Sequence, residues 1–163
     1  MPRHEVTAEA VVNAPAERAY ALIADYRDGH PRIIPRPPFV SLDVEQGGTG
    51  EGTVIRFQMR ILGRTRTFRA AITEPEPGRV LAETDLDTGA VTTFTIVPVE
   101  DGRKSRVIIT THLETRGGLL GGAERFLVTR LLRPVYRREI ERIGAVASER
   151  ARNEGRGEER KRS

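Results

Sequence analysis

The sequence predicts an α+β fold, in which a curved antiparallel sheet of seven strands is wrapped around one long C-terminal helix. Three observations lead to this prediction. The chain has 163 residues, the length of one domain. Residues 39–115 hold short alternating segments separated by turn signals, and residues 122–152 carry apolar side chains three or four positions apart. The helix therefore has to cover the apolar face of the sheet.

The first forty residues predict one strand and two short helices. Residues 4–12 alternate, with Val6, Ala8, Ala10 and Val12 on one face. Asn13 and Pro15 then supply a helix start before residues 16–26. The proline-rich segment that follows has room for one helical turn near residues 29–34 before it must become extended.

A meander of hairpins is predicted between Phe39 and Thr115. Its strands are expected at residues 39–46, 53–62, 65–74, 79–86, 91–98 and 105–115, with glycine-containing turns between most of them. Most strands have one apolar and one polar face. In the strand at 79–86 the more apolar set is predicted to face inward: Val80, Ala82, Thr84 and Leu86. Glu83 and Asp85 are therefore expected to face solvent.

The C-terminal third predicts a glycine-rich bridge, a helix and a tail. Residues 117–122 form the bridge, and the helix over 122–152 is expected to kink at Pro134. Residues 153–163 are highly charged and lack large apolar side chains, which predicts a disordered tail. The folded domain is accordingly predicted to span residues 1–152.

The width of the sheet predicts a cavity. Seven strands extend far beyond what one helix of about 10 Å diameter can cover. Aromatic residues make up only 5% of the chain and tryptophan is absent, so few bulky side chains could fill the gap. The side chains predicted to line it are Tyr26, Phe57, Met59, Phe68, Phe94, Leu132 and Tyr136. The two tyrosines would be its polar groups, and a purely structural core is the alternative for each residue.

The sequence lacks the residues that several classes of catalytic and metal-binding site require. The chain has no cysteine, which excludes disulfides, a cysteine nucleophile and thiolate metal sites. Its histidines, His4, His30 and His112, do not have the spacing of metal ligands, and no G-x-S-x-G elbow or phosphate-binding glycine loop occurs. We therefore expect no metal and no cofactor. The absence of cysteine, of a long apolar run and of a signal-like N-terminus predicts a cytoplasmic protein.

Titratable residues give no catalytic assignment from the sequence alone. His112 is expected at the surface or rim, and His30 is expected to be a solvated loop histidine, with a proton-transfer role as the alternative. An inward Glu83, Asp85 or His112 would favour an enzyme.

The basic residues predict a solvated surface rather than a binding site. The net charge is +4, and residues 150–163 carry +3 of it. The arginines of two adjacent strands, Arg56, Arg60, Arg66 and Arg69, are expected on the outer face of the sheet, with contact to an anionic membrane or nucleic acid as the alternative. No nucleic-acid partner is therefore predicted.

The order of elements, with its motifs, resembles the START-like helix-grip superfamily (SRPBCC), specifically its polyketide cyclase/dehydrase-like branch. The resemblance covers residues 5–150 and is carried by these segments: V-x-A-E-A-V-V-N-A-P-A-E-R-A-Y at 6–20, Ala24-Asp-Tyr26, Gly50-Glu-Gly-Thr53, Glu74-Pro-Glu-Pro-Gly-Arg79, Thr93-Phe-Thr-Ile-Val-Pro98 and the glycine-rich entry to the last helix. Many relatives place a tryptophan in the short second helix, where this chain has His30-Pro-Arg-Ile-Ile-Pro35. The resemblance therefore implies a different cavity mouth here.

The resemblance implies a deep cavity between sheet and C-terminal helix, which relatives use for lipids, sterols, quinones, polyketides or plant hormones. We expect this chain to bind or transport a small hydrophobic ligand such as a lipid, a quinone or a polyketide-like molecule. Two alternatives stay open: a polyketide cyclase or dehydratase-type enzyme, and a protein-interaction module. The ligand is the expected partner, and a homodimer is also possible.

Overall fold

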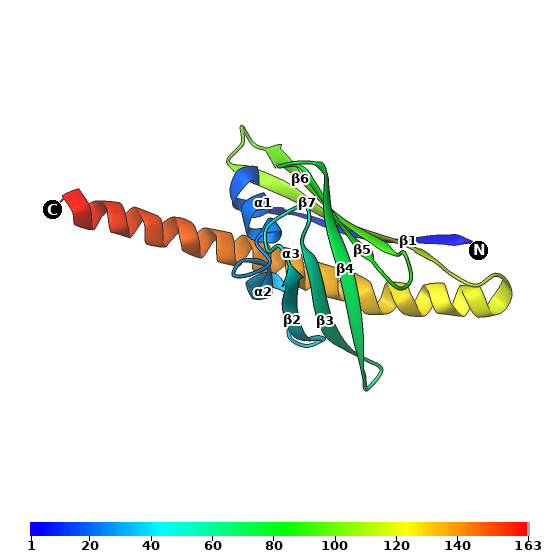
Figure 1. The fold of residues 1–163 in the computed structure, drawn as a ribbon. Helices are drawn as coiled ribbons and strands as arrows, with labels where there is room; N and C mark the ends of the chain where they lie inside the picture. The colour runs from blue at the N-terminus through cyan, green and yellow to red at the C-terminus, as the bar shows by residue number, and fades with distance from the viewer. Residues whose placement is uncertain (163) are drawn as a thin grey trace.

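The structure, a computed structural model, describes residues 1–162 and confirms the predicted fold class (Figure 1). The N-terminal elements are β1 (Arg3–Val12), α1 (Ala16–Ala24) and α2 (His30–Ile33). The meander consists of β2 (Phe39–Gln46), β3 (Val54–Ile61), β4 (Arg64–Glu76), β5 (Val80–Asp85), β6 (Val91–Val99) and β7 (Lys104–Glu114). The long helix α3 (Gly118–Arg162) ends the described chain.

All seven strands form one antiparallel sheet in the order β1-β7-β6-β5-β4-β3-β2. From β2 to β7 each strand pairs with the next one along the chain, and β1 pairs with β7 as an edge strand of the sheet. The helices α1 and α2 connect the two edge strands and pack against α3. Figure 1 shows α3 crossing the sheet, with both of its ends extending beyond it.

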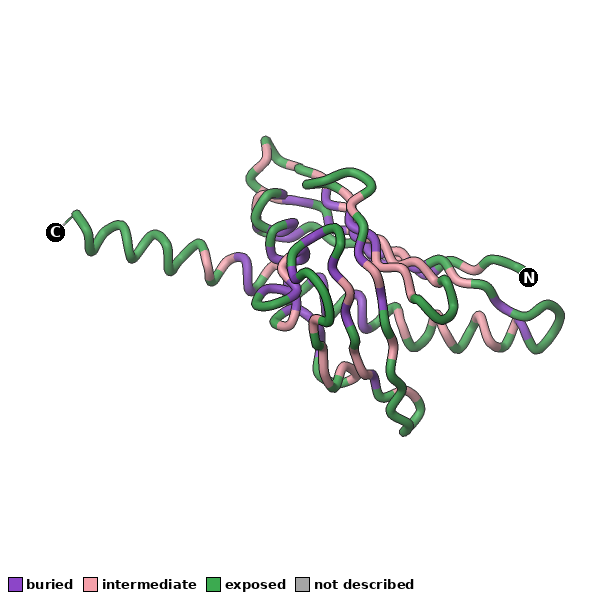
Figure 2. Tube along the Cα trace, in the orientation of Figure 1, coloured by how far each residue is buried: buried purple, intermediate pink, exposed green. Residues whose placement is uncertain are grey.

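The core lies where the middle of α3 meets the sheet and α1 (Figure 2). The predicted apolar stripe of α3 is buried there, with Ile140 and Ile143 at 1% exposure or less. On β1, Val6, Ala8 and Val12 are buried as predicted, whereas Ala10 is exposed. The meeting of these faces fixes the position of α3 over the sheet.

Both ends of α3 differ from the prediction. The helix begins at Gly118, inside the segment expected to be a flexible bridge. At Gly121 the Arg116 carbonyl occupies the space that a side chain would need, so glycine lets the preceding chain pack closely against the first turn. The residues expected to form a disordered tail continue the helix to Arg162, and they are exposed. Seven of residues 153–162 are arginine, glutamate or lysine, which are good helix formers, whereas Asn153, Gly155 and Gly157 are poor ones.

Among residues 1–162, no helix is both long and apolar enough to span a membrane.

Candidate functional site

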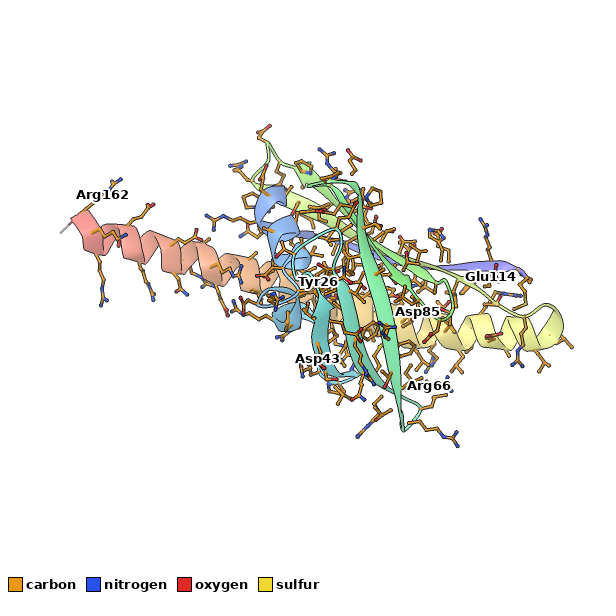
Figure 3. All side chains as sticks on the ribbon, in the orientation of Figure 1. Tyr26, Asp43, Arg66, Asp85, Glu114 and Arg162 are labelled. Carbon is orange, nitrogen blue, oxygen red and sulfur yellow. The ribbon has the colours of Figure 1, made fainter. Side chains whose placement is uncertain are left out.

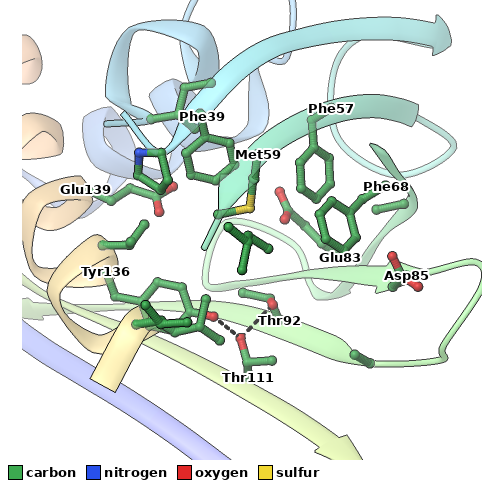
Figure 4. A pocket seen from close by; sticks show the side chains of 18 of the residues that line it. Phe39, Phe57, Met59, Phe68, Glu83, Asp85, Thr92, Thr111, Tyr136 and Glu139 are labelled. Carbon is green, nitrogen blue, oxygen red and sulfur yellow. Dashed lines mark hydrogen bonds between the residues drawn. The ribbon is translucent and has the colours of Figure 1, made fainter. Parts of the chain in front are cut away.

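A cavity of about 480 Å³ lies between α3 and the inner face of the sheet, at the β2–β5 side. Figure 4 shows its wall, to which β2, β3, β4, β5, β6 and α3 all contribute side chains. Most of these side chains are apolar. The sheet therefore curves around a space that α3 does not fill, as its width predicted.

Six of the seven side chains predicted to form the site lie in the cavity wall: Phe57, Met59, Phe68, Phe94, Leu132 and Tyr136. Phe57 stacks on Phe68 with their ring centroids 5.2 Å apart, and Phe39 adds a third ring 5.8 Å from Phe57. These three rings are half-buried and form an aromatic wall.

Tyr26 is the predicted residue that does not line the cavity. It is 1% exposed and lies behind the wall, with its ring stacked 4.5 Å from that of His30. Its phenol donates a 2.6 Å hydrogen bond to Glu83 Oε1. Tyr26 therefore contacts the cavity through a carboxylate rather than directly.

The prediction for β5 was wrong, because Glu83 and Asp85 face the cavity. Cross-strand partners share one face of a sheet. Glu83 pairs with Ile72 on β4 and with Thr92 on β6, and Asp85 pairs with Ala70. The buried Ile72 and Ala70 show that this is the inner face. By the same register Val80, Ala82 and Thr84 lie on the outer face.

His30 was also predicted wrongly: it is 3% exposed and lines the cavity instead of being solvated. Its Nδ1 lies 2.8 Å from the Ile23 carbonyl oxygen. Because a carbonyl only accepts hydrogen bonds, Nδ1 carries a proton. Nε2 then points toward two carboxylates, with Glu83 Oε1 at 3.7 Å and Glu139 Oε1 at 3.8 Å.

These residues define an acidic cluster of Glu83, Glu139 and His30, with Tyr26 behind it. Both carboxylate–imidazole distances exceed hydrogen-bond length, so neither carboxylate is hydrogen-bonded to the imidazole. Burial and the nearby Glu83 charge raise the pKa of Glu139 well above its usual value. Burial, followed by the charge of Glu83, likewise raises the pKa of the Tyr26 phenol. The cluster therefore combines a carboxyl group whose pKa lies well above its usual value with one that accepts a phenol hydrogen bond.

A second polar group lies on the wall between β6, β7 and α3. Tyr136 is hydrogen-bonded to Thr111, whose hydroxyl is also 2.7 Å from that of Thr92 (Figure 4). Burial raises the pKa of Tyr136 to about 12. The group therefore stays neutral at physiological pH and offers hydroxyls to a ligand.

The sequence analysis missed Glu139, although a signal was available. It lies within the apolar stripe of α3, three positions after Tyr136 and next to Ile140. A glutamate at a position that the helical period directs into the core is a candidate buried acid. His112, by contrast, is exposed as predicted, 3.6 Å from Glu5. Residues 1–162 contain no cluster of side chains suited to hold a metal ion.

The mouth of the cavity is formed by exposed residues from separate elements: Leu62 and Arg60 of the β3–β4 hairpin, Leu131 and Arg138 of α3, and Pro37 of the α2–β2 loop. The acidic cluster is contributed by α2, β5 and α3. Figure 3 shows Arg66 beside the β3–β4 hairpin.

Residues 3–148 match a family described as polyketide cyclase/dehydrase and lipid transport. The chain belongs to this family. The polyketide cyclase/dehydrase family has a fold that binds small ligands, which agrees with the cavity. No match was found among curated proteins.

Solved structures extend the likeness of fold to the START superfamily. The KanY protein (ms6282) is 23% identical, with a TM-score of 0.78 over 91% of this chain and 99% of that protein. The ZhuI aromatase/cyclase from Streptomyces sp. R1128 is 19% identical, with a TM-score of 0.74 over 92% and 96%. A START superfamily protein from Mycobacterium smegmatis is 16% identical, with a TM-score of 0.69 over 90% and 98%. The family match confirms the polyketide cyclase/dehydrase resemblance of the sequence, and these structures confirm its fold.

Proposed function

We propose that this member of the polyketide cyclase/dehydrase family binds a small, largely apolar, ring-containing ligand in the cavity between the sheet and α3. The observation that carries this proposal is the cavity itself, whose volume of about 480 Å³ lies within the usual range of small-molecule sites. The aromatic wall of Phe39, Phe57 and Phe68 favours a ring system over a plain acyl chain, because rings stack favourably on phenylalanine. Quinones and polyketide-like molecules fit this chemistry.

The protein-interaction alternative requires a filled interior, which the cavity does not provide. A neutral fluorescent probe, N-phenyl-1-naphthylamine, tests the ligand proposal without knowledge of the natural ligand. We expect saturable 1:1 binding with a rise in fluorescence. Leu132→Trp enlarges a half-buried side chain of the wall and is expected to weaken binding at least tenfold.

Val40→Trp is the matched control, since Val40 is 43% exposed and does not line the cavity. Its affinity for the probe should equal that of the wild type. Non-saturable binding, or equal binding by the Leu132 and Val40 variants, would contradict the proposal.

The acidic cluster favours a second candidate function, acid–base catalysis on the bound ligand of the kind a cyclase or dehydratase performs. Two carboxyl groups in different environments suit the roles of acid and base. Glu139, with its raised pKa, would donate its proton to a ligand carbonyl oxygen. Glu83 would take a proton from the adjacent carbon, so that the carbonyl becomes an enol. Both side chains line the cavity, as this reaction requires.

The probe 5-nitrobenzisoxazole tests this candidate, because a positioned base removes its ring C–H proton. The N–O bond then breaks and a coloured cyanophenolate forms. We expect Glu83→Gln to lower the rate at least a hundredfold. Glu74→Gln is the control, since Glu74 accepts a 2.6 Å bond from Tyr20 just as Glu83 does from Tyr26, but lies outside the cavity wall. Equal rates in both variants would reject catalysis, and retained naphthylamine binding would leave the ligand proposal standing.

A further inference from the structure

The first turns of α3 expose an unusual number of large apolar side chains. Leu119, Leu120 and Phe126 are 95%, 72% and 68% exposed, and Leu127 and Leu131 are about 40% exposed. On a helix of 3.6 residues per turn Leu119, Leu120, Phe126 and Leu127 share the side that faces away from the sheet, and Leu131 lies at the edge of that side next to the cavity. This part of α3 is therefore apolar on its outer side, whereas a helix that only covers a sheet is polar there.

The same stretch is strongly basic. Residues 116–138 contain six arginines and one glutamate. Arg130, Arg133 and Arg137 are exposed and lie on the same side of the helix as the leucines. Across the cavity mouth, the β3–β4 hairpin repeats the pattern, with Leu62 69% exposed among Arg60, Arg64 and Arg66 and no acidic residue between 60 and 66.

Both basic, apolar segments border the cavity mouth, since Leu62 and Leu131 line the cavity and are exposed. We call residues 116–138 and 60–66 together the mouth surface. In Figure 1 the start of α3 extends beyond the sheet at the end away from the C-terminus, and the β3–β4 hairpin extends past α3 at the bottom of the view. A flat partner could therefore contact both segments.

We propose that the mouth surface docks onto an anionic lipid bilayer, with its leucines and Phe126 in the interfacial layer and its arginines at the headgroups. Exposed apolar side chains flanked by arginine are the chemistry that binds a helix in the plane of a charged membrane surface. A second copy of this chain fits less well, because its arginines would face the same arginines. Nucleic acid would neutralise the arginines but leave the leucines in water. Docking goes beyond ligand binding and would deliver an apolar ligand directly to the mouth.

Vesicle sedimentation tests the proposal on the full chain. We expect it to bind vesicles of phosphatidylcholine with phosphatidylglycerol and to bind pure phosphatidylcholine at least a hundredfold more weakly. Each arginine near an anionic surface contributes about fivefold in affinity, so Arg130→Gln, Arg133→Gln and Arg137→Gln together should weaken binding about a hundredfold. Leu119→Gln, Leu120→Gln and Phe126→Gln together should also abolish stable binding, which electrostatics alone would not predict.

The other end of α3 provides the matched control. Arg152→Gln, Arg156→Gln and Arg160→Gln remove the same charge from the same helix, at exposed positions far from the mouth. This variant should bind vesicles as the wild type does, and an equal loss would overturn the proposal. The proposal would also be overturned if the wild type formed a dimer that is lost only in the variant with Leu119→Gln, Leu120→Gln and Phe126→Gln. Tighter binding of duplex DNA than of vesicles to the same arginines would overturn it as well. Naphthylamine binding in solution should be unchanged in every variant, which separates this test from the ligand proposal.

Discussion

At the scale of single residues, Glu139 makes folding stability depend on pH. Its pKa is well above the usual value of 4.5 in the folded protein, because burial and Glu83 disfavour its charge. Above about pH 4.5 the folded state therefore holds a proton that the unfolded state has lost, and stability falls as pH rises. Glu139→Gln keeps the shape of the neutral acid and removes this dependence. We expect its Tm to exceed that of the wild type at pH 8 and the difference to disappear by pH 4.

Circular dichroism melts between pH 4 and 8 measure this effect. Glu141→Gln is the control, because Glu141 is an exposed neighbour on the same helix. Its melting curves should follow the wild type at every pH. Parallel curves for the Glu139 variant and the wild type would show that Glu139 is ionised in the folded protein.

Two tyrosines permit a matched comparison of the cluster with a structural contact. Tyr26 and Tyr20 each donate a 2.6 Å hydrogen bond to a glutamate, Glu83 and Glu74 respectively. Tyr26→Phe and Tyr20→Phe should each lower the free energy of unfolding by about 1.5–3 kcal/mol, as expected for a bond to a charged acceptor. Urea unfolding measures this loss. Only Tyr26→Phe should also change the 5-nitrobenzisoxazole rate, because only Glu83 lines the cavity; equal rate changes would argue against the cluster.

Residue orientation was the least predictable feature, as β5 shows. Apolar content favoured Val80, Ala82 and Thr84 as the inner face. The hairpin register instead pairs Leu81 with Phe94, a residue that the sequence analysis had already predicted to line the cavity. In this hairpin each even-numbered residue of one strand pairs with an odd-numbered residue of the other, and paired residues lie on the same face. If Phe94 faces inward, its partner Leu81 and the alternate residues Glu83 and Asp85 must face inward too. Reasoning from register would have found the carboxylates where composition did not.

At the scale of elements, the glycine turn between β2 and β3 fixes the start of β3 next to α1. Gly50 donates a 3.0 Å hydrogen bond to the Ala24 carbonyl and has a φ of +60°. A Cβ added there would lie 2.5 Å from Glu74 Oε2. We expect Gly50→Ala to lower the free energy of unfolding by more than about 1 kcal/mol, combining backbone strain with this clash.

Gly52→Ala is the control for backbone strain alone. Gly52 has a φ of +88°, and nothing lies within 4 Å of an added Cβ. Urea midpoints should therefore fall further for Gly50→Ala than for Gly52→Ala. Equal midpoints would mean that Glu74 moves aside without cost.

Strand positions were predictable because alternation and turn residues are local. Each strand lies within two residues of its predicted bounds. The start of α3 was not predictable, because the close contact of Gly121 with the Arg116 carbonyl is a packing detail that glycine content does not reveal. The cluster was missed for a related reason: His30, Glu83 and Glu139 meet only once α2, β5 and α3 have docked.

At the scale of the whole molecule, the cavity was predictable because a sheet of seven strands is much wider than one helix. The boundary between the folded domain and the tail needs an experiment. We propose that residues 1–152 fold alone. Beyond them α3 is exposed, and Glu154 pairs with Arg18 at 2.9 Å across partly exposed side chains. Such a surface pair contributes at most about 1 kcal/mol. The free energy of unfolding of a chain ending at Arg152, measured by urea unfolding, should therefore lie within about 1 kcal/mol of that of the full chain.

The far-ultraviolet circular dichroism of the two chains decides how the tail behaves in solution. If residues 153–162 are helical as in the structure, shortening the chain removes helical signal in proportion to those residues. If they are disordered, as their charge predicted, the total helical signal stays constant, because isolated helical segments of this length are marginal in water. A drop in the free energy of unfolding well beyond 1 kcal/mol would instead place residues 153–162 within the folded domain and move its boundary past Arg152.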